Sequence, residues 1–271
     1  METEFKELTG GMRGLLWLAT ALVGLAGLQL FVFPEQTERF FAWTINPPLT
    51  AAFLGAAYWS SVAFEWTAAR QRVWANARIA VPTVFVFTVL TLMVTLIHLG
   101  NFHLGDEFEI LTQALTWFWI AVYVVVPIAL AWLMLTQGRA AGEDPPRIRP
   151  LADWLRLIVA VQAVLLIVVG VALLIAPEAT AWPWALTPLT GRAIGAWVVG
   201  IGVAAAHALW ENDIGRLRPA SWAFLAFGIL QTVSLARYPG DVDWSGVPAW
   251  IYVAFLVSAL VTGATTLRTK T

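Results

Sequence analysis

The sequence has no cysteine, almost no lysine and few charged residues of any kind. Without cysteine the chain can form no disulfide, thiolate metal site, iron–sulfur cluster or cysteine nucleophile. Its only lysines, Lys6 and Lys270, lie near the two ends, which excludes a retinal-type Schiff base on a membrane-buried lysine. Charged residues make up 12% of the chain, about half the share found in soluble domains, and hydrophobic residues make up 59%. This composition is typical of a membrane protein.

Familiar catalytic and cofactor motifs are also missing from the sequence. It contains no glycine-rich phosphate loop and no Gly-x-Ser-x-Gly elbow. Paired histidines for a haem would have to lie at one depth, whereas His98 and His207 fall at opposite ends of their predicted helices. The basic residues are scattered, which argues against nucleic acid as a partner. We therefore predict no cofactor.

Long apolar runs occupy most of the chain. Most of them are near the roughly 20 residues that cross a bilayer as a helix. They predict an all-α integral membrane protein with eight transmembrane helices, at about residues 16–35, 49–69, 79–99, 112–136, 155–176, 189–210, 219–237 and 247–267.

Basic residues are distributed unevenly between the loops on the two sides of these helices. Thirteen fall on the side of the termini and only three, Arg39, Arg192 and Arg237, fall on the other. The thirteen are Lys6, Arg13, Arg70, Arg72, Arg78, Arg139, Arg147, Arg149, Arg156, Arg216, Arg218, Arg268 and Lys270. Because basic loops remain in the cytoplasm, we predict that both termini are cytoplasmic. The excess of arginine over lysine and the many alanines indicate a bacterial source and hence the inner membrane.

The chain also contains an internal repeat. Residues 34–37 (PEQT) recur as residues 177–180 (PEAT), and residues 48–50 (PLT) recur as residues 188–190. Each copy lies between the first and second helices of a four-helix unit. Repeats of this kind set the architecture of a chain.

The repeat divides the chain into two membrane units. We predict a first four-helix repeat over residues 1–136, a cytoplasmic linker over 137–153 and a second repeat over 154–271. Four crossings return the chain to the side on which it started. The two repeats are therefore parallel and related by a pseudo-twofold axis along the membrane normal.

Small residues recur at four-residue spacing on the second helix of each half. Gly191 and Gly195 form one pair, and Ala51 and Gly55 form its counterpart. Such faces allow helix backbones to approach closely. We interpret them as the contact between the two second helices near the pseudo-axis.

Ionisable residues are rare within the predicted spans. Glu65 falls about 18 residues into its helix, roughly 27 Å along it, and so near the cytoplasmic surface. His207 falls at a similar depth, close to Glu211. A carboxylate at the middle of the membrane is thus missing, which argues against an ion-coupled transporter.

Polar side chains line one face of the third helix in each half and climb toward the outer side. The hypothetical ligand-binding residues on these two stripes are Thr91, Thr95, His98, Gln231, Ser234, Arg237 and Tyr238. Facing stripes that end in a cation suit a lipophilic or anionic small molecule in an outward-facing cleft between the halves. The alternative is packing, with hydroxyls bonded to their own helix and Arg237 paired with an acidic residue.

Potential metal ligands gather around one outer loop. They are His98, His103, Asp106 and Glu107, residue types that bind zinc and similar ions. Their spacing matches no recognised metal motif, so a solvated loop is the simpler interpretation.

Tryptophan is abundant, with sixteen copies. Those near outer helix ends, such as Trp43 and Trp184, are predicted to anchor the chain at the membrane interface. Deeper aromatic residues on the fourth helix either line a hydrophobic pocket or pack in the core. These are Trp117, Trp119, Tyr123 and Trp132.

Three functions are compatible with these features. The first is a protein that binds or carries a lipophilic or anionic small molecule. The second is a non-catalytic accessory or assembly subunit, with another membrane protein as its partner. The third is a membrane enzyme that uses the outer His/acid cluster, although no nucleophile, base and orienting group can be placed together. Apart from the lipid bilayer, the sequence identifies no partner.

Overall fold

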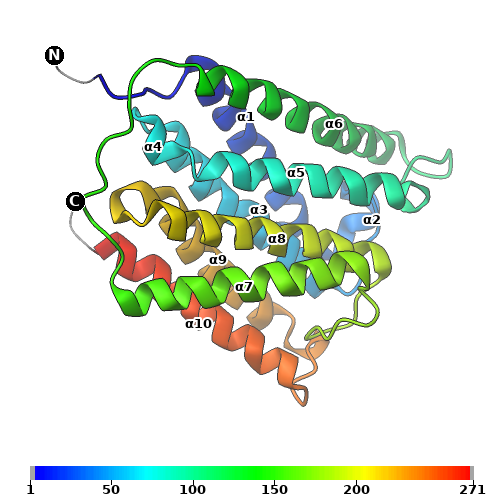
Figure 1. The fold of residues 1–271 in the computed structure, drawn as a ribbon. Helices are drawn as coiled ribbons and strands as arrows, with labels where there is room; N and C mark the ends of the chain where they lie inside the picture. The colour runs from blue at the N-terminus through cyan, green and yellow to red at the C-terminus, as the bar shows by residue number, and fades with distance from the viewer. Residues whose placement is uncertain (1–3, 269–271) are drawn as a thin grey trace.

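The structure, a computed structural model that describes residues 4–268, is a bundle of long helices (Figure 1). The eight long helices are α1 (Gly10–Gly27), α3 (Pro48–Ala69), α5 (Ala80–Ile97), α6 (Ile110–Gly138), α7 (Asp153–Ile175), α8 (Pro188–Glu211), α9 (Arg218–Arg237) and α10 (Val247–Arg268). Helix α1 continues into a wider π-helical turn, Leu28–Val32. The shorter pieces are α2 (Thr37–Phe40), α4 (Trp74–Ala77) and four 3-10 turns, Pro34–Gln36, Leu99–Asn101, Ile214–Leu217 and Pro239–Asp241.

The predicted all-helical class is confirmed. Every apolar run of the sequence lies on one of the long helices, and residues 4–268 contain no β-strand beyond two isolated bridges. Seven of the long helices have the length and apolarity needed to cross a membrane. The chain is therefore a multi-pass membrane protein.

Helix α3 is the long helix that does not reach this apolarity. It contains Tyr58 and the pair Ser60 and Ser61 near its middle, and Glu65 near its end. Most of its residues are buried by neighbouring helices, so it has little need of an apolar, lipid-compatible surface. Whether it forms an eighth crossing depends on its place in the bundle and not on its hydropathy.

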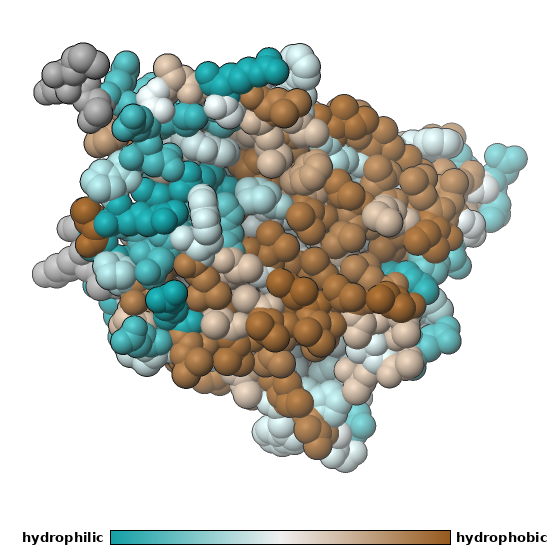
Figure 2. Space-filling view, viewed as in Figure 1, coloured by the Kyte–Doolittle hydropathy of each residue, from teal (hydrophilic) through white to brown (hydrophobic). Residues whose placement is uncertain are grey.

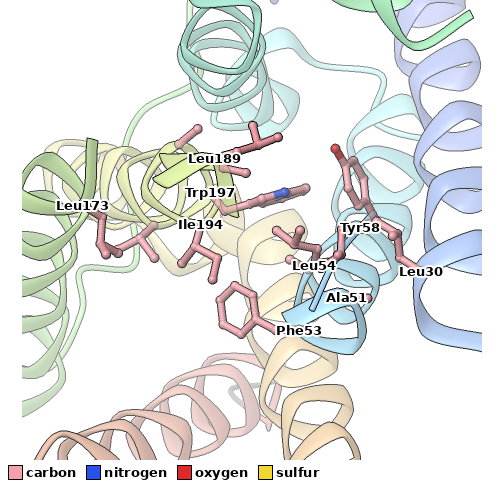
Figure 3. Packing of buried hydrophobic residues seen from close by; sticks show 14 of the residues in the cluster. Leu30, Ala51, Phe53, Leu54, Tyr58, Leu173, Leu189, Ile194 and Trp197 are labelled. Atoms are coloured by element: carbon pink, nitrogen blue, oxygen red, sulfur yellow. The ribbon is translucent and has the colours of Figure 1, made fainter. Parts of the chain in front are cut away.

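The helices pack in two groups that mix the two ends of the sequence. In one, α1 packs on α3, α3 on α9 and α9 on α10. In the other, α7 packs on α8, α8 on α5 and α5 on α6. Helices α3 and α8 are the inner members of the two groups, and they face each other across the centre of the bundle through large side chains (Figure 3).

The small-residue faces make different contacts from those predicted. A Cβ on Gly55 would overlap the backbone nitrogen of Phe31, and a Cβ on Gly195 would lie 2.9 Å from the carbonyl oxygen of Gly170. These glycines therefore bring α3 against the end of α1 and α8 against α7. The prediction that they join α3 to α8 is wrong, because bulky aromatic side chains occupy the space between those two helices.

Two of the outer tryptophans are placed differently from the prediction. Trp43 and Trp184 are buried, with 3% and 5% of their surface exposed. The Trp184 indole donates a hydrogen bond to the Thr50 hydroxyl at 2.9 Å, and Trp43 packs edge-on against Trp119. These two tryptophans thus pack in the core and do not anchor the chain at the membrane interface.

Several loops meet at one end of the bundle. The N-terminal segment hydrogen-bonds both to the linker, from Lys6 N to Glu143 O, and to the loop before α4, from Leu8 N to Arg72 O. Twelve of the thirteen basic residues predicted to be cytoplasmic lie on these segments or on helix ends beside them; Lys270 lies outside the described residues. Figure 2 shows this end as hydrophilic and the middle of the visible face as a broad hydrophobic band.

Candidate functional site

A cavity lies between the two groups of helices, beside α3 and α8. It has a volume of about 110 Å³ and is lined by residues of α1, α3, α5, α6, α8 and α9, with one residue of α10. Most of these residues are apolar. Because lining residues come from both halves of the sequence, the cavity exists only when the two halves are packed together.

Glu65 is the charged residue on the wall of this cavity, and it is almost fully buried, with 2% of its surface exposed. Its Oε2 atom has no hydrogen-bond partner. Glu65 lies four residues before the end of α3, in agreement with the depth counted from the sequence. The structure adds that neighbouring helices enclose this side chain, so that it faces the cavity and not water.

Tyr58 lies two helical turns before Glu65 on the same face of α3. Its hydroxyl is 2.6 Å from the hydroxyl of Tyr123 on α6, and both side chains line the cavity. In this pair one hydroxyl donates to the other, and the accepting hydroxyl keeps its own proton to donate elsewhere. The two tyrosines thus supply a hydrogen-bonding point in a mostly apolar wall.

Aromatic rings surround this point. We call them the aromatic cluster: Tyr58, Phe87, Trp119, Tyr123 and Trp197. The ring centroids of Phe87 and Trp197 are 4.0 Å apart, and those of Tyr58 and Trp197 are 4.8 Å apart in an edge-to-face arrangement. Figure 3 shows Trp197 reaching from α8 toward Tyr58 on α3.

The structure separates the four deeper aromatic residues predicted on the fourth helix. Trp119 and Tyr123 line the cavity, as the pocket interpretation requires. Trp117 and Trp132 are 60% and 66% exposed and point out of the bundle. Only every third or fourth residue of α6 faces inward, so the two alternatives apply to different faces of one helix.

The cavity reaches the surface of the bundle between α1 and α6. Leu25 of α1 and Phe118 of α6 line it and are 42% and 47% exposed. Both lie within helices that are apolar enough to cross a membrane. The opening therefore faces the side of the bundle that lipid would cover and not the aqueous ends.

The predicted polar stripe on α5 is directed into hydrogen bonds of the bundle. The hydroxyl of Thr91 donates to the Phe87 carbonyl at 2.9 Å, and that of Thr95 donates to the Thr91 carbonyl at 2.8 Å. Thr95 also accepts a hydrogen bond from the Trp119 indole at 3.2 Å. Both threonines are buried. Their hydroxyls fit the packing alternative.

The stripe on α9 is equally occupied. Gln231 is fully buried, donates to the Phe53 carbonyl at 2.9 Å and accepts from the Tyr252 hydroxyl at 3.0 Å. Ser234 is fully buried too and bonds the Ala52 carbonyl. These side chains fasten α9 to α3 and α10.

The outer ends of the stripes lie apart. Arg237 donates to the Phe31 carbonyl, and the Tyr238 hydroxyl is 3.1 Å from a carboxylate oxygen of Glu35. His98 instead accepts a hydrogen bond from Arg192 at 3.1 Å; burial and this guanidinium lower the pKa of His98. Since α5 packs on α8 and α6 while α9 packs on α3 and α10, the structure does not bring the two stripes into one cleft.

The potential metal ligands are also separated. His103 is buried and makes two hydrogen bonds of 3.0 Å, from Nδ1 to the Phe41 carbonyl and from the Thr44 hydroxyl to Nε2. Asp106 and Glu107 are exposed. Among residues 4–268, no three His, Asp or Glu side chains are close enough to hold an ion together. The metal hypothesis and the enzyme built on this cluster thus gain no geometric support.

A second buried carboxylate lies at the end of α8. Glu211 is fully buried and accepts hydrogen bonds from Arg78 at 2.9 Å and from Arg216 at 2.8 Å, with His207 3.3 Å away. Arg78 also pairs with Asp144 of the linker. This charge is fully compensated, and the group attaches the linker to the bundle.

The cavity was not predicted, although the sequence contains one signal of it. Tyr58, Ser61 and Glu65 fall at positions i, i+3 and i+7, a polar stripe on one face of α3. All three line the cavity. The aromatic cluster has no comparable signal, because its five residues come from four helices.

Comparisons with known proteins do not identify this chain: no family model, curated protein or solved structure matches it.

Proposed function

We propose that this chain is a multi-pass membrane protein that binds or carries a lipophilic small molecule in the cavity between its two halves. The observation that carries the proposal is the aromatic-lined cavity, whose mostly apolar wall includes a few polar groups, among them Tyr58, Tyr123 and Glu65. Pockets for small molecules combine an apolar wall with a few polar groups that fix orientation. The buried carboxylate favours a neutral or cationic ligand over the anionic one expected from the sequence.

The architecture we propose is two parallel four-helix repeats with eight crossings, in which α3 is the crossing with low apolarity. Three packed pairs have counterparts: α1 on α3 with α7 on α8, α9 on α3 with α5 on α8, and α10 on α9 with α6 on α5. A pseudo-twofold axis between α3 and α8 accounts for this exchange of helices. The gathering of basic residues at the end that holds both termini supports a cytoplasmic location for that end. A bacterial inner membrane remains part of the proposal.

We propose that the ligand enters from the bilayer. The cavity opens between α1 and α6, where Leu25 and Phe118 are exposed on apolar helices. A lipophilic molecule is concentrated in the hydrocarbon layer and would reach this opening without crossing water.

The test uses the neutral dye N-phenyl-1-naphthylamine and the full chain in nanodiscs of an uncharged glycolipid. Energy transfer from tryptophan to the dye, corrected for empty nanodiscs, reports binding. Ala26→Trp narrows the opening, since Ala26 lines the cavity and is only partly exposed. We expect it to weaken saturable dye binding by about tenfold or more, a loss of roughly 1.4 kcal/mol.

The matched control is Ala121→Trp, at an exposed position on α6 that does not line the cavity. It should bind the dye like the wild type. Absence of saturable binding to the wild type, or equal binding by all three proteins, would contradict the proposal.

A further inference from the structure

We propose that the ligand of this cavity carries an ammonium-type cation, with Glu65 as its counter-ion and the aromatic cluster around its positive end. The inference rests on the proposed function and specifies the class of ligand. An ammonium group occurs both in free lipophilic amines and in lipid headgroups, so the two sources are separated below.

The two buried glutamates, Glu65 and Glu211, differ in their surroundings. Glu211 shows how this chain stabilises a buried carboxylate, with arginines on both of its oxygen atoms. Glu65 is buried almost as completely, but its Oε2 has no partner. An ionised carboxylate in such surroundings costs several kcal/mol unless a positive charge lies beside it.

The residues of the cavity wall cannot supply that positive charge. Among the residues that the structure places on the cavity wall there is no lysine, arginine or histidine. The titratable groups on the wall are Glu65 and the tyrosine pair, Tyr58 on its own helix and Tyr123 on α6. Without a ligand, the carboxyl avoids the cost of ionisation by holding a proton. A cationic ligand removes that cost and takes the place of the proton.

The aromatic cluster also favours a cationic ligand. Ring faces attract cations within about 6 Å of the ring centroid, most strongly where water is excluded. Phe87, Trp119 and Trp197 are all on the cavity wall beside the tyrosine pair. Trp119 gives its indole hydrogen to Thr95, so only its ring can contribute to the cavity wall. Negative charge and ring faces in one cavity select for a cation with an apolar body.

The test measures displacement of N-phenyl-1-naphthylamine from the full chain in the same glycolipid nanodiscs. The competitors are hexyltrimethylammonium and its uncharged carbon isostere, 2,2-dimethyloctane. In the wild type we expect the cation to displace the dye at concentrations about tenfold or more below those of the isostere, the effect of one desolvated charge pair. Glu65→Gln should remove this preference, measured as the ratio of the isostere and cation concentrations that displace half of the dye from the same variant. Glu65→Asp, which keeps the charge, should restore part of it.

The control is Glu107→Gln, which removes an exposed carboxylate far from the cavity wall and should keep the wild-type preference. Thermal unfolding of each variant checks that it is folded. A second arm adds phosphatidylethanolamine to the nanodiscs: displacement by this lipid assigns the ammonium to a headgroup, and displacement by the free cation alone assigns it to a small molecule.

The two levels of the proposal fail differently. If the dye binds but the isostere competes as well as the cation, or Glu65→Gln has no effect, Glu65 binds only a proton and the inference is overturned while the proposed function stands. If the dye does not bind saturably to the wild type, the proposed function fails as well.

Discussion

At the scale of single residues, two buried glutamates illustrate how surroundings decide the role of a side chain. Glu211 ends α8 beside two arginines and a histidine, and serves to hold the linker. Glu65 lies on α3 among aromatic and aliphatic residues, and one of its oxygens has no partner. A carboxylate whose charge is already neutralised gains little from a ligand, whereas an unpaired one favours a cation.

His103 provides a prediction about pH. Burial lowers the pKa of this imidazole, and the neutral ring joins two outer segments through Phe41 and Thr44. The unfolded chain binds a proton at the ordinary pKa of about 6.5 and the folded chain only at lower pH. Stability should therefore fall as the pH decreases through about 6.5, and level off below the folded-state pKa.

The measurement is the thermal unfolding midpoint in neutral detergent between about pH 8 and pH 5. The pKa of His98 is lowered as well, so both residues contribute to the slope. Replacing each with glutamine, which does not titrate, should reduce the pH dependence, and the double variant should reduce it further. An unchanged slope in the double variant would refute the prediction.

At the scale of helices, glycine decides which neighbours approach closely. Gly170 of α7 and Gly195 of α8 face each other, and a Cβ on Gly170 would lie 2.7 Å from the backbone nitrogen of Val199. Helix α8 begins with a reciprocal capping box between Thr187 and Thr190 and Pro188 as its first residue. The residues at the start of α8 determine where this helix begins, and the glycines allow α7 to pack closely against it.

Gly170→Ala tests this packing. The added methyl group must push backbone apart, which should destabilise the protein by about 1–3 kcal/mol. Gly14→Ala is the control, because a Cβ there meets nothing within 4 Å on an exposed face of α1. The control should be neutral or stabilising by up to about 1 kcal/mol, since alanine favours helix. Equal unfolding midpoints for the two variants would contradict the close approach of α7 and α8.

At the scale of the whole molecule, each packed group of helices takes members from both ends of the chain. Helix α9 is fastened to α3 by the side chains of Gln231 and Ser234, which bond carbonyls of the first half. The Trp184 indole adds a bond to Thr50. The halves therefore depend on one another, and the cavity between them is a property of the assembled chain.

Topology can be tested cleanly because the chain has no cysteine of its own. Asp106→Cys lies in an exposed outer loop and Ala141→Cys in the exposed linker. In intact cells, a membrane-impermeant maleimide should label the first and leave the second unlabelled until the membrane is broken. The reverse pattern would overturn the predicted orientation, which depends on the distribution of basic residues.

The sequence by itself determined the helical class, the positions of the long helices and their membrane character. These properties depend on runs of neighbouring residues, such as the apolar stretch of α7, and on local breaks such as Pro34 and Pro177. The depth of a residue along its helix can also be counted from the sequence. The helices that enclose the residue cannot be identified in this way. The burial of Glu65 was therefore not predicted, and the two polar stripes were assumed to face each other.

Only the tertiary structure decided what each side chain meets. Tyr58 and Tyr123 are 65 positions apart, and Trp197 lies far beyond both in the chain. Their proximity depends on which helices pack together, and glycines such as Gly55 and Gly170 have many partners that would be sterically acceptable. Local composition sets the helices because backbone hydrogen bonds in a membrane must be satisfied within each segment. The cavity requires contacts between distant segments, which no local pattern specifies.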